Sequence, residues 1–212
     1  MADSTLLNLV LWLPVLGMVG IALLPRGSDS RVRGLSLAVM LLQLLLTAVL
    51  YQRFDPDQPG LQFVTDIPWI REWGVGYRIG LDGLNVLLVA LTAFLGPLVV
   101  AGAFSAIQKD VKLFYAMVFF IQFAMMGTFL AQDLFLFYVF WEAMLIPMFL
   151  IIGIWGGARR VYASFKFFLY TLLGSVLMLL AIMAMYSYAG TTDIAEILAD
   201  KNFPAEMQTW LW

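Results

Sequence analysis

The stretch LFLFYVFWEAMLIPMFLIIGIW, residues 134–155, decides the class of this protein. A helix needs about 20 mostly apolar residues to cross roughly 30 Å of hydrocarbon, and this stretch supplies them. A carboxylate, Glu142, interrupts the apolar run, and Pro147 follows within the next two turns. The stretch therefore predicts a transmembrane helix that carries an acidic group in its middle.

Composition places the whole chain in the same class. The chain has 212 residues, of which 63% are hydrophobic and 12% are charged, whereas a soluble domain carries about 25% charged residues. The formal net charge of −2 indicates no nucleic-acid partner. The sequence has no cysteine and no histidine, the usual ligands of iron–sulfur clusters, haem and zinc. We therefore expect a membrane protein with no redox cofactor or metal in this chain.

Five further apolar runs are long enough to span a bilayer. They cover Leu6–Leu24, Leu35–Tyr51, Leu84–Phe104, Leu113–Ala131 and Phe165–Tyr188. Together with residues 134–155 they predict an all-α polytopic transmembrane helix bundle of about six spanning helices, in a single domain over residues 1–212. The first run lacks a basic leader and is too long for a cleaved secretory signal. A seventh run begins at Met207–Trp212, so the sequence reads as truncated at the start of a seventh helix.

The loop charges predict an orientation. Lys and Arg gather in the first, third and fifth connections between the runs. Because basic residues accumulate in cytoplasmic loops, we expect the N-terminus and the second connection to lie outside. That connection, residues 52–83, is an external loop long enough for structure of its own. Its segment FVTDIPWIREWGVGYRIG, residues 63–80, favours a short strand pair or an interfacial segment. The glycines in it lack the spacing and flanking elements of a nucleotide-binding motif.

Glu142 is the charged residue farthest from any predicted membrane boundary. At a rise of about 1.5 Å per residue it lies roughly 12 Å inside its helix. An ionised side chain at such depth costs about 3 kcal/mol, so an acid there is by default a functional group with a partner. Burial disfavours the charged form of a carboxylate and a nearby cation favours it, which makes Glu142 a switchable proton-binding group. The alternative is a glutamate permanently hydrogen-bonded to neighbouring helices.

Two nearby features bear on this site. Pro147 has no N–H, so the carbonyl of Ala143 loses its helical partner and offers a site for ordered water beside Glu142. The alternative is a plain helix kink, which membrane helices tolerate. Lys166 begins the sixth helix, where it either faces inward as a proton relay or snorkels to the headgroups. Small polar groups also line the helices, each with helix packing as the alternative role; they are Gln122, Thr128, Tyr138, Tyr170, Thr171 and Ser175.

Three segments carry a family resemblance. They read DLFLFYVFWEAMLIPMFLIIGIWGG from residue 133, RRVYASFKFFLYTLLGS from residue 159, and YRIGLDGLNVLLVALTAFL from residue 77. Together they resemble the antiporter-like membrane subunits of proton-pumping NADH-quinone oxidoreductase, respiratory complex I, and chain M is the type they resemble most. The pattern W-E-x-x-x-x-P followed by K-F-F-x-Y-T is specific to that wider group, and the resemblance covers essentially the whole chain.

The resemblance implies an all-helical subunit built partly from inverted helical repeats. It implies that Glu142 matches an essential fifth-helix glutamate paired with a lysine on a seventh helix, that Lys166 matches a basic relay or charge-partner position, and that Asp82 is structural. It implies redox-coupled proton translocation in a bacterial inner membrane, beside other complex I membrane subunits and the lipid bilayer. Flavin and iron–sulfur clusters are expected in other subunits. The alternatives are a subunit of a multisubunit Na⁺/H⁺ antiporter and a non-transporting scaffold fragment.

Overall fold

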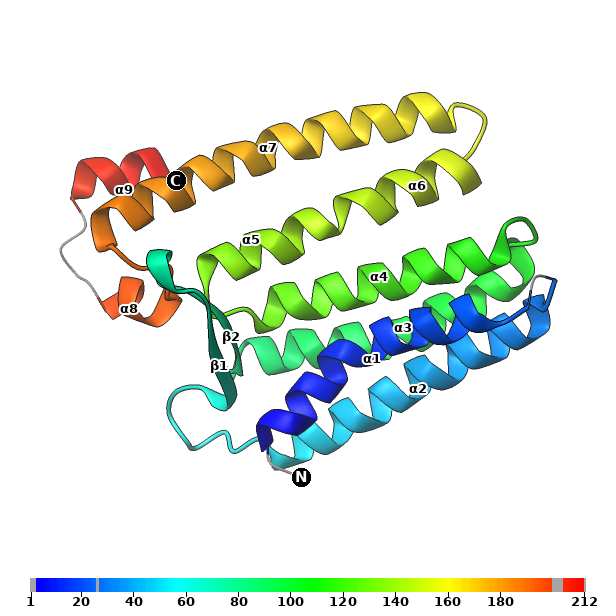
Figure 1. The fold of residues 1–212 in the computed structure, drawn as a ribbon, viewed down its shortest axis with the longest axis horizontal. Coiled ribbons are helices and arrows are strands. Elements are labelled where there is room, and N and C mark those ends of the chain that lie inside the picture. Colours follow the sequence, from blue (N-terminus) through cyan, green and yellow to red (C-terminus); the bar gives the residue numbers. More distant parts are fainter. Residues whose placement is uncertain (1–2, 26, 200–203, 212) are drawn as a thin grey trace.

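The computed structural model describes residues 3–25, 27–199 and 204–211. Within them, six helical spans are long and apolar enough to cross a membrane, so the chain is a multi-pass membrane protein. These spans lie side by side as an elongated bundle (Figure 1). The helices are α1 (Asp3–Leu23), α2 (Asp29–Arg53), α3 (Asn85–Ala106), α4 (Val111–Leu130), α5 (Leu134–Ala143), α6 (Leu145–Trp155) and α7 (Arg160–Ala189), followed by the short α8 (Ile194–Ala199) and α9 (Ala205–Leu211). The predicted bundle is confirmed.

The core of the bundle lies among α1, α2, α3 and α4, whose neighbouring pairs pack along their lengths. The helices α5 and α6 pack on α4, and α7 forms the outer layer on α5 and α6 (Figure 1). The share of residues that are buried falls accordingly from 56% in the span of α4 to 11% in that of α7. The site region therefore lies at the side of the bundle, between its core and an outer helix.

Two buried glutamines connect the four core helices through hydrogen bonds in the apolar interior. Gln43 of α2 donates to the carbonyl of Val10 in α1 at 2.9 Å. Gln122 of α4 donates to Oε1 of Gln43 at 3.0 Å and to the carbonyl of Thr92 in α3 at 3.1 Å. A buried amide is tolerated when its groups are paired, and these bonds pair it across four helices. Gln122 is thus a packing group rather than part of a path around Glu142.

The apolar stretch at residues 134–155 is broken where one continuous span was predicted. Helix α5 ends at Ala143 and α6 begins at Leu145, with Met144 between them. The N–H of Met144 bonds to the carbonyl of Trp141 at 3.3 Å, which tightens the last turn. Pro147 cannot donate to the carbonyl of Ala143, so this turn loses a second helical bond. The expected kink lies at Met144, two residues after Glu142, and Met144 itself keeps helical backbone angles, with φ −70° and ψ −24°.

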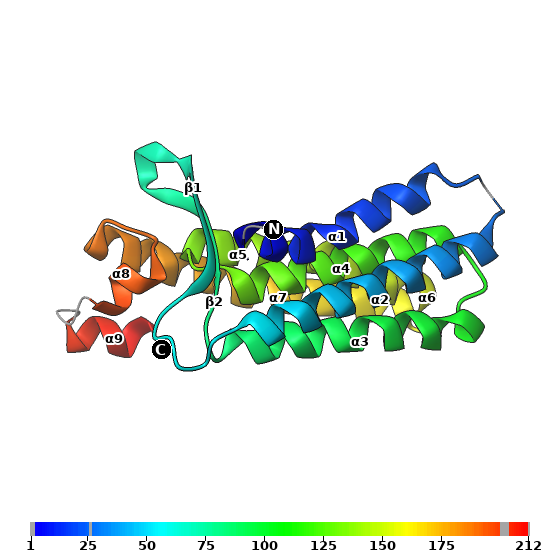
Figure 2. The same ribbon diagram turned by 90° about the horizontal axis from the view of Figure 1, so that it is seen from below.

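The second connection forms the predicted strand pair. Strand β1 (Gln62–Ile70) pairs antiparallel with β2 (Val75–Leu81), and a 3₁₀ turn at Arg71–Trp73 joins them. Gly74 closes that turn with a φ of 67°, a conformation that glycine adopts without strain. The hairpin stands across one end of the bundle, near the start of α1 (Figure 2). We call this the hairpin end, and the opposite end, with the odd-numbered connections, the basic end.

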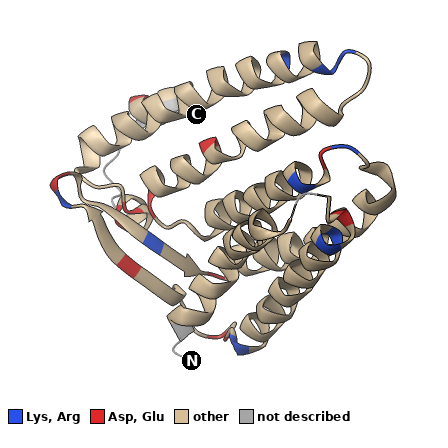
Figure 3. Cartoon of the chain, turned by 45° about the vertical axis from the view of Figure 1, so that its right-hand side comes forward, with Lys and Arg blue, Asp and Glu red and all other residues tan. Residues whose placement is uncertain are grey.

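At the basic end, Lys and Arg side chains donate hydrogen bonds to carbonyls at the C-terminal ends of helices. Lys112 donates to the carbonyls of Ala22 and Leu24, both at 2.8 Å, where α1 ends. Arg33 donates to the carbonyl of Ile107 at 2.9 Å, just past α3, and Arg160 to that of Ile154 at 3.0 Å in α6. Carbonyls at a helix C-terminus have no intrahelical donor, so a basic side chain satisfies both their hydrogen bonding and their partial charge. Figure 3 shows the charged residues concentrated toward the two ends.

The residues expected to begin a seventh run fall mainly in α9. Met207 lies within that helix, while Trp212 lies outside the described residues. Asp82 has the structural role implied by the resemblance. Its Oδ1 accepts the N–H of Leu84 at 2.8 Å and that of Asn85 at 2.7 Å. In turn, the N–H of Asp82 donates to Oδ1 of Asn85 at 2.8 Å. This reciprocal pair starts α3 at the hairpin end.

Candidate functional site

Glu142 occupies the last turn of α5, immediately before the break. Its side chain is half-buried, and its Oε1 is buried without a hydrogen-bond partner among the described residues. No ion pair reaches it from the part of the chain that the structure describes. Nearly all buried polar atoms in proteins have a partner, and the exceptions mark sites that bind something else. The unpartnered oxygen therefore makes Glu142 the candidate group of this site.

Two polar neighbours accompany this carboxylate. Tyr138 lies one helical turn before Glu142 on the same face of α5 and interacts electrostatically with it. Tyr138 also contacts Ser175 of α7, whose side chain is buried. The sequence suggested both residues as polar lining groups, and the structure brings Tyr138 to Glu142 and Ser175 to Tyr138. Together they form a polar seam between α5 and α7 at the depth of the acid.

An apolar cavity of about 360 Å³ adjoins the break on the side of α4. Thr128 of α4 and Thr171 of α7 line it, together with Trp141 and Met144. Both hydroxyls bond to carbonyls of their own helices, at 2.9 Å for Thr128 and 2.8 Å for Thr171. Two of the predicted polar groups thus line this cavity, but their hydroxyl hydrogens are already used within their own helices.

Lys166 does not meet Glu142 among the described residues. Its side chain is exposed on α7 and lines a cavity of about 580 Å³ at the basic end, beside Arg159 and Arg160. Tyr170, one turn further, is 82% exposed on the same side. Of the two readings of the sequence, this position agrees with a lysine that reaches toward the headgroups.

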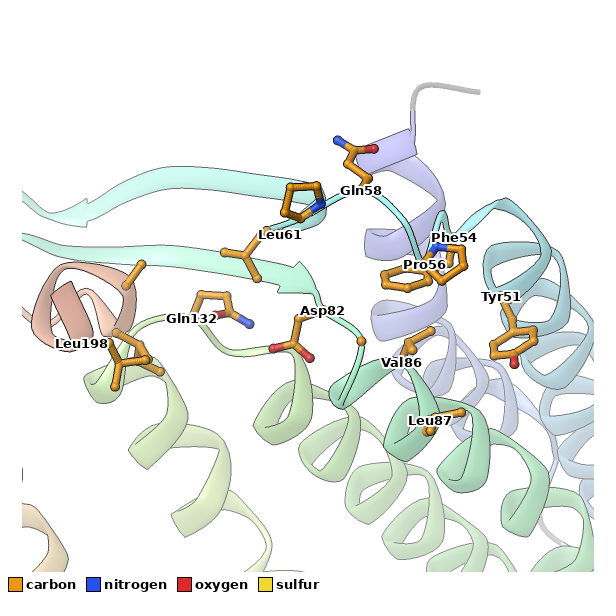
Figure 4. Close-up of a pocket in the computed structure, with 15 residues that line it drawn as sticks. Tyr51, Phe54, Pro56, Gln58, Leu61, Asp82, Val86, Leu87, Gln132 and Leu198 are labelled. Carbon is orange, nitrogen blue, oxygen red and sulfur yellow. The ribbon is translucent and has the colours of Figure 1, made fainter.

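A cavity of about 780 Å³ lies at the hairpin end. It is bounded by the loop after α2, the start of α3 and α8 (Figure 4). Tyr51, Phe54 and Leu198 contribute apolar walls, and Gln132 faces Asp82 across the opening. Among its described lining residues Asp82 alone is charged, and that carboxylate is already engaged at the start of α3. The cavity holds no second group for acid–base chemistry.

The hairpin is fastened to α1 through Tyr77. Its hydroxyl donates to Oδ1 of Asn8 at 2.9 Å and accepts from the indole of Trp12 at 3.2 Å. Asn8 in turn donates to the hydroxyl of Thr65 in β1 at 2.8 Å. Burial raises the pKa of the Tyr77 phenol, while the hydrogen bond from Trp12 acts in the opposite direction. Both strands are therefore bonded to the first helix.

Asp133 is the buried acid that the sequence reading did not single out. It precedes α5 directly, caps that helix and is 0% exposed. An Asp just before a long apolar run is a recognisable helix start. Its partners could not be read in the same way, because Gly76 lies 57 residues before it and Thr192 lies 59 residues after it.

Comparison with known proteins agrees with this architecture. A family model described as NADH:quinone oxidoreductase/Mrp antiporter, TM, matches residues 131–211. NADH-quinone oxidoreductase subunit M of Rhodobacter capsulatus is 46% identical over 200 residues, which cover 92% of this chain and 38% of that relative. The chain thus spans about two fifths of the length of this relative.

Solved structures share the fold. Respiratory complex I from Thermus thermophilus contains a chain that matches with a TM-score of 0.80 and 31% identity, over 97% of this chain and 41% of that one. The Mrp complex from Dietzia matches with a TM-score of 0.81 but 19% identity, over 100% of this chain and 22% of that one, which shows the fold alone. With the family match, the relative and these structures in agreement, the chain belongs to the antiporter-like membrane subunits of the NADH:quinone oxidoreductase/Mrp family.

Proposed function

We propose that this chain is part of a membrane-arm subunit of NADH:quinone oxidoreductase and takes part in redox-coupled proton translocation. The observation that carries the proposal is Glu142, a carboxylate at mid-span with a buried, unpartnered oxygen beside a helix break. The identity to subunit M of Rhodobacter capsulatus supports the choice of complex.

Glu142 is the group that binds and releases the transported proton. In apolar surroundings the neutral acid is favoured, and an approaching cation or water favours the carboxylate. A change in the partner or in the hydration of the carboxylate therefore moves a proton on or off it. The unpaired carbonyl of Ala143 offers an acceptor for a water at this point, and Tyr138 and Ser175 extend the polar seam toward α7.

The electrostatic partner of Glu142 is assigned by the family resemblance to a lysine on a seventh helix. We also propose that Lys166 is a second proton relay or charge partner, which acts at the basic end and not in contact with Glu142. Its neighbours Arg159 and Arg160 raise the local density of positive charge there. Such a field attracts anions to the surface.

The same proposal implies where electron transfer takes place, which partners surround this chain and how it is oriented in the membrane. Electron transfer from NADH to quinone belongs to other subunits, which hold the flavin and the iron–sulfur clusters. Neighbouring antiporter-like subunits and the lipid bilayer are the partners of this chain. The basic end faces the cytoplasm of a bacterial inner membrane, and the N-terminus and the hairpin lie outside, as the distribution of Lys and Arg indicates.

Replacement of the acid tests the proposal. We expect Glu142→Gln, in the assembled membrane complex, to lower proton translocation per electron about 100-fold or more, because the amide cannot carry a proton. The measurement is acidification of the lumen of inverted membrane vesicles during NADH oxidation, with assembly checked by native electrophoresis. Glu196→Gln, an exposed acid of α8, is the matched control. Normal pumping by a correctly assembled Glu142→Gln complex would refute the role of the acid.

Two alternative functions predict different results. A multisubunit Na⁺/H⁺ antiporter shares the fold, as the Mrp likeness shows; transport would then require Na⁺ and would continue without NADH. A scaffold fragment would tolerate Glu142→Gln without any loss of transport in the complex that contains it. The genes that neighbour the coding sequence separate the first rival most cheaply, because genes for redox subunits favour the oxidoreductase.

A further inference from the structure

A fully buried carboxylate joins three separate segments at the hairpin end. Oδ1 of Asp133 accepts the N–H groups of Phe135 at 2.9 Å and Leu136 at 3.1 Å, which caps α5. Its Oδ2 accepts the N–H of Gly76 in β2 at 3.2 Å and the hydroxyl of Thr192, after α7, at 2.6 Å. A buried charge is costly unless its lone pairs are satisfied, and here each oxygen accepts two bonds.

Arg78 of β2 supplies the positive charge of this cluster. Its Nη1 lies 3.7 Å from Oδ2 of Asp133 and 3.3 Å from Oδ2 of Asp193. Its Nε bonds to Oδ1 of Asp66 in β1 at 3.1 Å. One guanidinium thus bridges the hairpin, the cap of α5 and the segment that follows α7. We name Arg78, Asp133, Thr192 and Asp193 the hairpin latch.

Main-chain bonds hold the same segments in register. The N–H of Gln132 bonds to the carbonyl of Arg78 at 2.8 Å, and that of Leu134 to the carbonyl of Thr192 at 2.8 Å. The N–H of Ile194 returns to the carbonyl of Gln132 at 3.1 Å. Strand β2, the start of α5 and the exit of α7 therefore lie side by side as short extended segments. Capping a helix requires none of these bonds, so the latch does more than start α5.

Helix α5 is short and is held at its start, so a movement of its start is passed to Glu142 near its end. It begins at Leu134, directly after Asp133 of the latch, and ends at Ala143, where the hydrogen bond missing at Pro147 weakens the connection to α6. Glu142 lies nine residues beyond Asp133, about 13 Å along the axis at the usual helical rise. The facing helix α7 is held by the same latch through Thr192. The latch therefore fixes the two helices whose contact contains Tyr138, Glu142 and Ser175.

We propose that the hairpin latch positions Glu142, so that a displacement of the external hairpin is transmitted through Asp133 and along α5 to the proton-binding carboxylate. Arg78 and Asp133 are positioning residues that act through α5 and do not touch the proton. This inference rests on the proposed function of Glu142, and it adds the element outside the membrane to which that site is mechanically connected.

Three variants separate the latch from the helix cap. Asp133→Asn keeps an Oδ1 that can cap α5, because Asn is as good a cap as Asp, but it removes the charge and the acceptor for Gly76 and Thr192. Arg78→Gln removes the bridge between strands and helices, and Arg78→Lys keeps a charge that cannot reach three carboxylates at once. The matched control is Asp66→Asn, since Asp66 contacts Arg78 from the hairpin side and its side chain is 56% exposed.

The first measurement does not depend on pumping. The carboxyl stretching band of protonated Glu142, assigned by its loss in Glu142→Gln, is recorded by infrared difference spectroscopy on the purified chain in lipid bilayers. We expect the band to shift in Asp133→Asn and Arg78→Gln, to return partly in Arg78→Lys and to stay in place in Asp66→Asn. An unshifted band in folded Asp133→Asn overturns the inference. If Asp133→Asn does not fold, Thr192→Val, which deletes one contact of Oδ2, gives the same decision.

The second measurement uses the assembled complex. Couplings between sites of this kind amount to about 0.5–2 kcal/mol, so we expect translocation per electron to fall roughly 2- to 30-fold in Arg78→Gln. The decrease should be smaller in Arg78→Lys and absent in Asp66→Asn. A shifted band together with normal pumping by Glu142→Gln would overturn the proposed function and leave the positioning intact. A loss of pumping in Glu142→Gln with no band shift in the latch variants would overturn the positioning alone.

Discussion

Gly127→Ala tests the contact that seats α5 on α4. A Cβ at Gly127 would fall against Cγ, Cδ1 and Cε1 of Phe140, far inside the roughly 3.5–4.0 Å at which carbon atoms attract each other. The ring is buried and lies two residues before Glu142. Alanine at residue 127 must therefore push the ring, and α5 with it, away from α4.

The magnitude can be worked from the same contacts. Overpacking of a tight interior costs about 1–3 kcal/mol. The displaced ring also weakens its edge-to-face contact with Phe123, whose centroid lies 5.3 Å away, a pair worth about 0.5–1.5 kcal/mol. Alanine returns at most about 1 kcal/mol through its higher helix propensity. We expect Gly127→Ala to lower the free energy of unfolding by roughly 1–3 kcal/mol.

The assay is equilibrium unfolding of the chain in mixed micelles, followed by circular dichroism. Gly102→Ala is the matched control, because Gly102 is also helical but a Cβ there meets no atom within 4 Å. We expect that control to be neutral or slightly stabilising. Equal stability of the two variants would refute the reasoning, because it would mean that the Gly127–Phe140 contact does not constrain α5.

Two further predictions concern the hydrogen bond between Gln122 and Gln43 and the buried hydroxyl of Tyr77. Gln122→Leu leaves Oε1 of Gln43 without its donor in the interior, so we expect a loss of about 1 kcal/mol; a double-mutant cycle with Gln43→Met in the same unfolding assay should give a nonzero coupling, and strict additivity would contradict the bond. Tyr77 has a raised pKa in the folded protein. Its contribution to stability is therefore complete below the unfolded value near pH 10 and is lost as pH rises through the folded value. Tyr77→Phe should weaken that alkaline decline, measured by tyrosinate absorbance and unfolding against pH, and an unchanged decline would contradict the assignment.

The spans were predictable because hydrophobic length is a local property. Each apolar run became a helix or, for residues 134–155, a pair of helices within one span. The strand pair in the second connection was one of two predicted alternatives, since alternation around Gly74 is local information. The kink was expected from Pro147, but its position at Met144 was not, because apolar residues continue on both sides of the proline and give no sign of where the helix bends.

Long-range pairing was what the sequence could not supply. Gln122 was a candidate for a polar path, yet it bonds to Gln43, 79 residues away, in the core of the bundle. Lys166 could have faced either way, because one side chain on an apolar helix does not reveal which helices cover it. Asp133 had a readable helix-start signal, but Arg78 and Thr192 reach it only once β2 and the exit of α7 are in place.

The break between α5 and α6 also creates an electrostatic feature inside the membrane. Each helix carries a macrodipole, with its negative pole at the carbonyl end and its positive pole at the amide end. At Met144 the negative pole of α5 meets the positive pole of α6, and Glu142 lies beside this junction. The pole of α5 opposes a negative charge on the carboxylate, while the pole of α6 favours it. Bending at Met144 therefore changes the balance between the two poles, and with it the electric field at the side chain of Glu142.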